Sequence, residues 1–137
     1  VQPLLYSSTG GIDNCGLYWK WPGYGVSKKT IHGRKPDAVT STCYLMRKSL
    51  WDAYQGFDTH LLTSHEDVDF SLRTQRTSVS NISCALHLGN ATLRHQPSHN
   101  RSAFHRDRVY VIRKHYTGFN RLLRLAAVYL LDSIPRP

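Results

Sequence analysis

Glycine and proline are concentrated near the beginning of the chain, and this distribution constrains the fold more than any other feature. Six glycines and two prolines fall within residues 10–36, separated only by short β-favouring segments such as residues 17–19. Closely spaced glycine and proline favour turns and short strands over helices. Helical patterns occur only later in the chain, so the sequence predicts a single α/β domain of 137 residues.

The middle of the chain predicts a strand followed by two helices. Residues 38–46 are β-branched and apolar, which favours a buried strand. Residues 47–54 predict a short helix, and Gly56 stands where a left-handed cap favours glycine. Ser64 is expected to be the N-cap of a second helix, with an acidic residue three positions on as in a capping box, and Val68 and Leu72 on the inward face.

The last third of the chain predicts one or two strands and then two helices. Residues 79–93 alternate between short apolar and polar pieces around a glycine. Residues 104–116 have apolar side chains at helical spacing with basic residues between them. Residues 119–131 form another helical stretch, amphipathic at its start and apolar all round from Leu125.

Positive charge is concentrated in the last third of the chain. The chain has a net charge of +9, and residues 94–137 carry nine basic residues against only Asp107 and Asp132. Such a block predicts an anionic partner: phosphate, nucleic acid or a membrane surface. The simpler alternative is a solvated basic helix face. Three dispersed cysteines without a Cys-x-x-Cys pair, and no secretory signal, favour a reduced cytoplasmic setting.

The densest group of acidic residues follows Gly56-Phe57-Asp58 and comprises Glu66, Asp67 and Asp69. Carboxylates at a helix start face the positive end of the helix dipole, which is expected to keep them ionised. An ionised carboxylate can act as a general base toward a hydroxyl. Acidic residues also serve as simple caps at many helix starts, so the spacing alone leaves both interpretations open.

Residues 38–73 resemble the second half of the catalytic domain of family-2 glycosyltransferases of the GT-A fold, particularly the rhamnosyltransferase-like branch. A looser resemblance extends from about residue 12 to residue 116. The motifs that carry it stand in the family's order and spacing: Tyr44-Leu45-Met46-Arg47, Trp51, Gly56-Phe57-Asp58, Glu66-Asp67-Val68-Asp69 and Arg73. The resemblance implies the acceptor-side half of a GT-A domain, with a short mixed sheet and flanking helices.

The activity implied by this resemblance is inverting transfer of a sugar from a nucleotide-diphosphate donor to a hydroxyl acceptor, in cell-surface polysaccharide synthesis. The family pattern makes Asp67 the catalytic base and gives Glu66 a role in orienting the acceptor. Substrate-binding roles are implied for four further residues. Of these, Asp69 and Arg73 are also expected to support the helix, Asp58 to lie near the acceptor pocket, and Arg101 to face donor phosphates or an anionic lipid-linked acceptor.

The resemblance also implies a divalent metal, Mn²⁺ or Mg²⁺, in the complete enzyme, with His95 as the candidate ligand. The family's nucleotide-binding half, with its Asp-x-Asp motif, has no counterpart in this sequence. We therefore expect residues 1–118 to be the C-terminal half of a catalytic domain, residues 119–137 to be a helix with a tail, and the chain to be inactive by itself.

Two functions without catalysis remain as alternatives. A nucleic-acid-binding module could use residues 94–124, where Tyr110, Tyr116 and Phe119 are interleaved with basic residues, although no helix-turn-helix, RNP or zinc-finger signature supports it. A membrane-surface module could use residues 119–131, with Arg121 and Arg124 at the edge of an apolar helix. In the glycosyltransferase interpretation, the same helix is expected to contact the inner face of the plasma membrane. The structural alternative is that this helix packs on the domain's own sheet or on sequence that originally followed Pro137.

Overall fold

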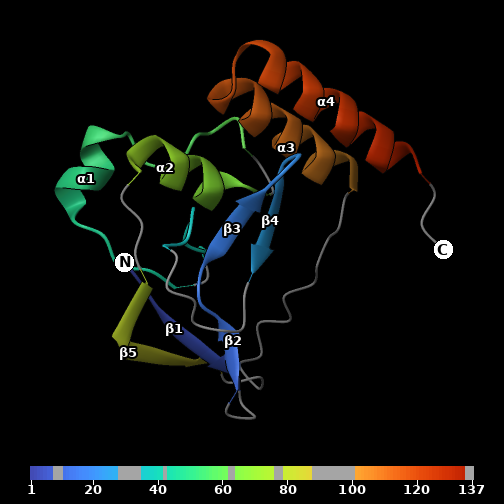
Figure 1. The fold of residues 1–137 in the computed structure, drawn as a ribbon. Helices are drawn as coiled ribbons and strands as arrows, with labels where there is room; N and C mark the ends of the chain where they lie inside the picture. The colour runs from blue at the N-terminus through green and yellow to red at the C-terminus, as the bar shows by residue number, and fades with distance from the viewer. Residues whose placement is uncertain are drawn as a thin grey trace.

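The computed structural model describes residues 1–7, 11–27, 35–41, 43–61, 64–75, 79–87 and 101–134. It confirms the α/β class, with strands in the first part of the chain and two long helices at its end (Figure 1). The strands are β1 (Gln2–Ser7), β2 (Ile12–Asn14), β3 (Leu17–Lys20), β4 (Tyr24–Ser27) and β5 (Val79–His87). The helices are α1 (Lys48–Ala53), α2 (Glu66–Thr74), α3 (Arg101–His115) and α4 (Gly118–Ser133).

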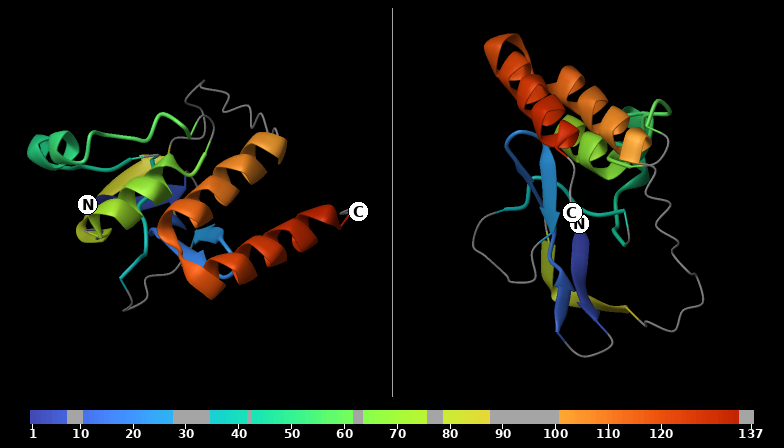
Figure 2. Two further views of the ribbon diagram at one scale, coloured as in Figure 1. Left: turned by 90° about the horizontal axis from the view of Figure 1, so that it is seen from above. Right: turned by 90° about the vertical axis from the view of Figure 1, so that its right-hand side faces the viewer.

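The strands form a mixed three-stranded sheet and a separate hairpin. In the sheet, β1 lies between β2, which is antiparallel to it, and β5, which is parallel to it. Strands β3 and β4 pair antiparallel as the hairpin. The hairpin reaches from the sheet toward α3 and α4, which lie side by side on the far side of the molecule (Figures 1 and 2).

Trp19 on β3 joins the two apolar clusters of the core. One cluster contains Val68 of α2 and Val111 of α3, and the other contains Ile112 of α3 and Val128 of α4; Trp19 packs against both. The hairpin therefore holds α2, α3 and α4 together, and Arg124 of α4 adds a hydrogen bond to the carbonyl of Pro22 in the hairpin turn at 3.1 Å.

The strand expected over residues 38–46 is wrong, although the burial expected for its first residues is confirmed. Among the described residues of this segment (38–41 and 43–46), only Ala38 forms a β-bridge, with Leu17. The next backbone N–H groups donate to side chains instead: Val39 to Ser71 Oγ at 3.2 Å and Thr40 to Gln2 Oε1 at 2.8 Å. Because these side chains satisfy the buried backbone, no neighbouring strand is required, and the apolar composition reflects burial rather than a ladder.

Helix α1 and the turn after it agree with the sequence. The helix ends near Tyr54, and Gly56 adopts a φ of +67° in the left-handed region. A Cβ at Gly56 would lie 2.6 Å from Cζ2 of Trp51. Glycine is therefore required here by both backbone conformation and space.

The N-cap of α2 differs from the expectation. His65, and not Ser64, is the cap residue; it has a φ of +67° and makes no side-chain cap hydrogen bond. The hydroxyl of Ser64 instead lies 2.7 Å from Nδ1 of the His65 ring. A capping box needs an extended cap residue whose side chain faces the helix, and the left-handed turn at His65 prevents that geometry.

The structure confirms the helices expected over residues 104–116 and 119–131, which are α3 and α4. It also confirms a strand within residues 79–93, which is β5. Within the described ranges, no helix is long and apolar enough to cross a membrane. Cys15 and Cys43 form no disulfide within the part of the chain that the structure describes. The basic residues of α3 are not one solvated face: Arg108 is buried against Asp132 and Arg106 pairs with Asp107.

Candidate functional site

Asp67 lies in the first turn of α2 and is held by two backbone N–H groups. Its Oδ2 accepts a hydrogen bond from Ser41 N at 2.9 Å, and its Oδ1 accepts one from Val68 N at 2.7 Å. The first contact ties the start of α2 to the extended segment after Ala38. The carboxylate is thereby fixed in position while its side chain stays partly accessible.

Burial raises the pKa of Asp67. The hydrogen bond from Ser41 lowers this pKa and the neighbouring charge of Glu66 raises it, and the net shift is upward. The helix dipole alone predicts the opposite direction, so desolvation outweighs it at this position. A carboxylate with a raised pKa is a stronger base than an ordinary aspartate, which suits proton abstraction from a hydroxyl.

A pocket of about 710 Å³ lies between α1, α2 and residues 44–47. Tyr44 lines this pocket, and its pKa is raised by burial and then by the charges of Asp67 and Glu66. Asp67 and Glu66 are not themselves among the residues that line the pocket. The rest of the lining is mainly apolar and includes Val39, Met46, Leu50 and Phe70.

Asp69 is completely buried and is surrounded by three basic side chains. Arg73 Nε lies 2.8 Å from Oδ2, and Lys114 Nζ and His115 Nε2 lie 2.9 and 2.8 Å from Oδ1. Burial raises the pKa of Asp69, but the hydrogen bonds from His115, Lys114 and Arg73 outweigh it and lower the pKa. Asp69 thus supports the helix, as expected, and presents no exposed surface to a substrate.

Arg73 ties α2 to the end of α1. Besides Asp69, its guanidinium donates to the carbonyl of Tyr54 at 2.6 Å and to the carbonyl of Gly56 at 2.7 Å. These carbonyls lie at the C-terminal end of α1, where helical partners are missing. The planar guanidinium group of Arg73 can donate to three acceptors in this arrangement. Arg73 thus supports the helix, which is one of the roles expected from the sequence.

Asp58 is joined to α3 and not to the start of α2. Its Oδ2 accepts from Lys114 Nζ at 2.6 Å and from Tyr110 Oη at 2.8 Å, while its Oδ1 accepts from the backbone N–H of His60 at 3.0 Å. Burial raises the pKa of Asp58, but these hydrogen bonds, with Lys114 the strongest, hold it well below its usual value. In this arrangement Asp58 has a structural role, because it is bonded to two residues of α3.

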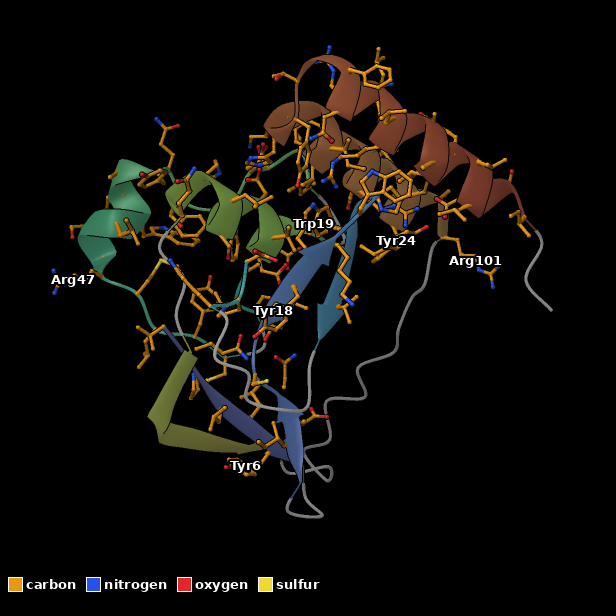
Figure 3. The ribbon with its side chains drawn as sticks, viewed as in Figure 1. Tyr6, Tyr18, Trp19, Tyr24, Arg47 and Arg101 are labelled. Carbon is orange, nitrogen blue, oxygen red and sulfur yellow. The ribbon has the colours of Figure 1, made fainter. Side chains whose placement is uncertain are left out.

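Arg101 and His95 stand apart from these contacts. Arg101 is exposed at the first turn of α3, and its side chain extends away from the helices and the hairpin (Figure 3). His95, the candidate metal ligand, lies outside the described residues. In the described ranges, no group of three or more histidine, cysteine or acidic side chains could hold a metal ion. Asp58 and Asp69 are already paired with cations, so the described residues do not fit a divalent metal.

Lys114 and His115 are the residues whose roles sequence reasoning missed. Lys114 bridges Asp58 and Asp69, and His115 bonds Asp69. In the sequence Lys114 was one member of a basic block, with donor phosphates or solvent as the expected surroundings. Lys114 and His115 are adjacent basic residues at the end of a helix. Nothing in the neighbouring sequence indicates that they face buried carboxylates.

Comparison of the chain with protein-family models, with curated proteins and with solved structures finds no match in any of the three.

Proposed function

We propose that this chain supplies the acceptor-side half of an inverting glycosyltransferase, in which Asp67 is the general base. The observation that carries the proposal is the position of Asp67. It is a partly buried carboxylate with a raised pKa, fixed by Ser41 N at 2.9 Å. The order of motifs in residues 38–73 supports the same assignment.

The acceptor is expected in the pocket next to Tyr44. Its volume of about 710 Å³ is within the range of small-molecule sites, and its mainly apolar lining suits the ring face of a sugar or an attached apolar group. A hydroxyl of this acceptor would reach Asp67 from the Tyr44 side. Glu66, the adjacent carboxylate, would accept a hydrogen bond from a second hydroxyl and so orient the ring.

In the proposed reaction, Asp67 takes the proton from the acceptor hydroxyl while the hydroxyl oxygen bonds to the anomeric carbon of the donor. The bond between that carbon and the donor phosphate breaks, and the nucleoside diphosphate leaves with the electron pair. The hydroxyl is a weak nucleophile, and a positioned base contributes roughly 10²–10⁴-fold to such a step. The described residues contain no group of three or more metal-ligating side chains that could hold a cation beside the leaving diphosphate, and we assign no residue to that part of the reaction.

The test is sugar transfer by the protein that carries this chain, with uridine- and deoxythymidine-diphosphate sugars as donors. Asp67→Asn keeps the size of the side chain and removes its basicity, so turnover should fall by roughly 10²–10⁴-fold. Asp52→Asn is the matched control, because Asp52 is exposed on α1 and pairs only locally, with Lys48 at 2.6 Å. Near-normal turnover by a folded Asp67→Asn variant would exclude Asp67 as the base.

The nucleic-acid alternative has less support once the contacts of α3 are considered. Lys114 and Arg108 are engaged with carboxylates, and Tyr110 donates to Asp58. Tyr116 lies beneath the guanidinium of Arg124 at 4.0 Å. Stacking on single-stranded nucleic acid needs accessible aromatic faces beside free cations. Tyr110 and Tyr116 are used within the fold, and of the three aromatic residues considered Phe119 alone is exposed.

A further inference from the structure

The polar and apolar sides of α4 are reversed relative to an ordinary surface helix. Its charged side chains face the fold: Arg124 bonds the carbonyl of Pro22, and Asp132 pairs with Arg108 and His105. Val128 is the one residue of α4 that is fully buried in the part of the chain that the structure describes. Leu125 and Val128 pack in the cluster that also contains Trp19 of the hairpin, but most of the large apolar side chains of α4 remain exposed. The packing alternative considered from the sequence therefore holds for only part of this helix.

The outer face of α4 is the row formed by Phe119, Leu122, Leu123, Ala126, Leu130 and Ile134. These positions are spaced i, i+3, i+4, i+7, i+11 and i+15, so they share one side of the helix. The five large side chains are between 46% and 73% exposed. The row contains no charged residue. A continuous exposed apolar strip of this kind is typical of a surface that contacts another protein or a membrane.

We propose that the outer face of α4 docks onto an anionic lipid surface, a role that does not depend on the glycosyltransferase assignment. Charge complementarity favours lipid over a second copy of the chain. Helices α3 and α4 together carry seven Lys and Arg residues against two Asp residues, and the whole chain has a net charge of +9. Two copies apposed along α4 would bring like charges together, whereas an anionic surface attracts them.

The two acidic residues of these helices are themselves paired. Asp107 lies against Arg106, and Asp132 lies between Arg108 and His105, so these pairs cancel the charges of Arg106 and Arg108. Lys114 is likewise held by Asp58 and Asp69. The basic residues of the two helices that have no acidic partner among the described residues supply the excess positive charge: Arg101, Arg113, Arg121 and Arg124.

The dimensions of α4 fit a helix that lies in the interface and does not cross it. Its 16 residues span about 24 Å at 1.5 Å per residue, and a bilayer core is about 30 Å thick. An amphipathic helix of this kind inserts its apolar face about 5–10 Å below the headgroups. Phe119 at one end and Leu130 and Ile134 near the other would anchor both ends of the helix.

Vesicle flotation of the 137-residue chain tests this proposal. Phosphatidylcholine vesicles containing a quarter phosphatidylglycerol should bind the chain at low salt, and pure phosphatidylcholine vesicles should bind it much less. Raising the salt concentration should weaken binding, because a Debye length of about 10 Å at 0.1 M shortens to about 3 Å at 1 M. The double variant Leu122→Asp, Leu130→Asp should reduce binding at least about tenfold, since each inserted leucine contributes more than a factor of ten by area.

Both leucines are exposed, so the double variant should fold, which circular dichroism can establish. Leu45→Asp is the matched control: Leu45 is a 77% exposed leucine in the segment between β4 and α1, and its replacement should leave vesicle binding unchanged. The proposal is overturned if the chain does not bind anionic vesicles at low salt, or if the folded double variant still binds. A dimer in sedimentation, abolished by the double variant without any vesicle binding, would identify a second copy as the occupant instead.

Discussion

Arg73→Lys is a sharp test of how α2 is held against the end of α1, because it keeps the positive charge and removes the planar guanidinium. Arg73 donates to Asp69, to the carbonyl of Tyr54 and to the carbonyl of Gly56 at 2.6–2.8 Å. A lysine ammonium placed beside Asp69 cannot also reach both carbonyls in the same plane. The substitution therefore leaves two acceptors at the end of α1 without their charged donor.

The magnitude follows from these two lost contacts. Hydrogen bonds to charged groups contribute about 1.5–3 kcal/mol each, and water can replace part of that at a side chain that is 19% exposed. We therefore expect Arg73→Lys to lower the free energy of unfolding by about 2–4 kcal/mol. With a urea m-value near 2 kcal/mol/M, the midpoint should fall by roughly 1–2 M and the m-value should not change.

The assay is urea unfolding at pH 7, followed by circular dichroism and tryptophan fluorescence. Arg113→Lys is the matched control, because Arg113 is exposed on α3, and its free energy of unfolding should stay within about 0.5 kcal/mol of that of the original chain. If Arg73→Lys is as stable as Arg113→Lys, the guanidinium contacts with α1 do not stabilise the fold, and the reasoning about α2 is refuted.

Two further predictions concern the turn after α1 and the response to acid. Gly56→Ala should lower the free energy of unfolding by about 2–4 kcal/mol, because the new Cβ would meet Trp51 at 2.6 Å in a left-handed backbone. Gly118→Ala has the same kind of φ with open space, so it should cost only about 1 kcal/mol; equal losses in urea would contradict the clash. The pKa values of Asp58 and Asp69 are lowered by folding, so their contribution to stability is complete above about pH 4 and is lost as the pH falls toward the folded pKa values. A urea midpoint that does not change between pH 5 and pH 2.5 would contradict the lowered pKa values.

The sequence predicts the helices well because their signals are local. The periodic apolar residues of α3 and the glycine after α1 are each determined by neighbours within about one turn. The sequence wrongly predicts a strand over residues 38–46, because a β-branched, apolar composition indicates burial but not which groups accept the backbone hydrogen bonds. Gln2 and Ser71, which satisfy that backbone, are more than thirty positions away in the chain.

The sequence likewise predicts the local features of the candidate site but not its long-range contacts. The acidic start of α2 is visible in the sequence, but its contacts with α3 are not, since Asp58 and Lys114 are 56 positions apart. No local sequence signal indicates the left-handed turn at His65, because capping preferences favour Ser64 as the N-cap. Burial then decides the direction of the Asp67 pKa shift, and burial depends on the tertiary fold.

The helix period explains why two carboxylates only two positions apart have different roles. Successive residues of an α-helix are rotated by about 100°, so Asp67 and Asp69 point to nearly opposite sides of α2. Asp69 faces α3 and the end of α1, where Arg73, Lys114 and His115 hold it. Asp67 consequently faces the segment at Ser41, from whose backbone N–H it accepts a hydrogen bond. The contacts of Asp69 fix the rotation of α2 about its axis, and that rotation sets where the Asp67 carboxylate stands. In the proposed enzyme, the buried carboxylate therefore positions the base without touching the substrate.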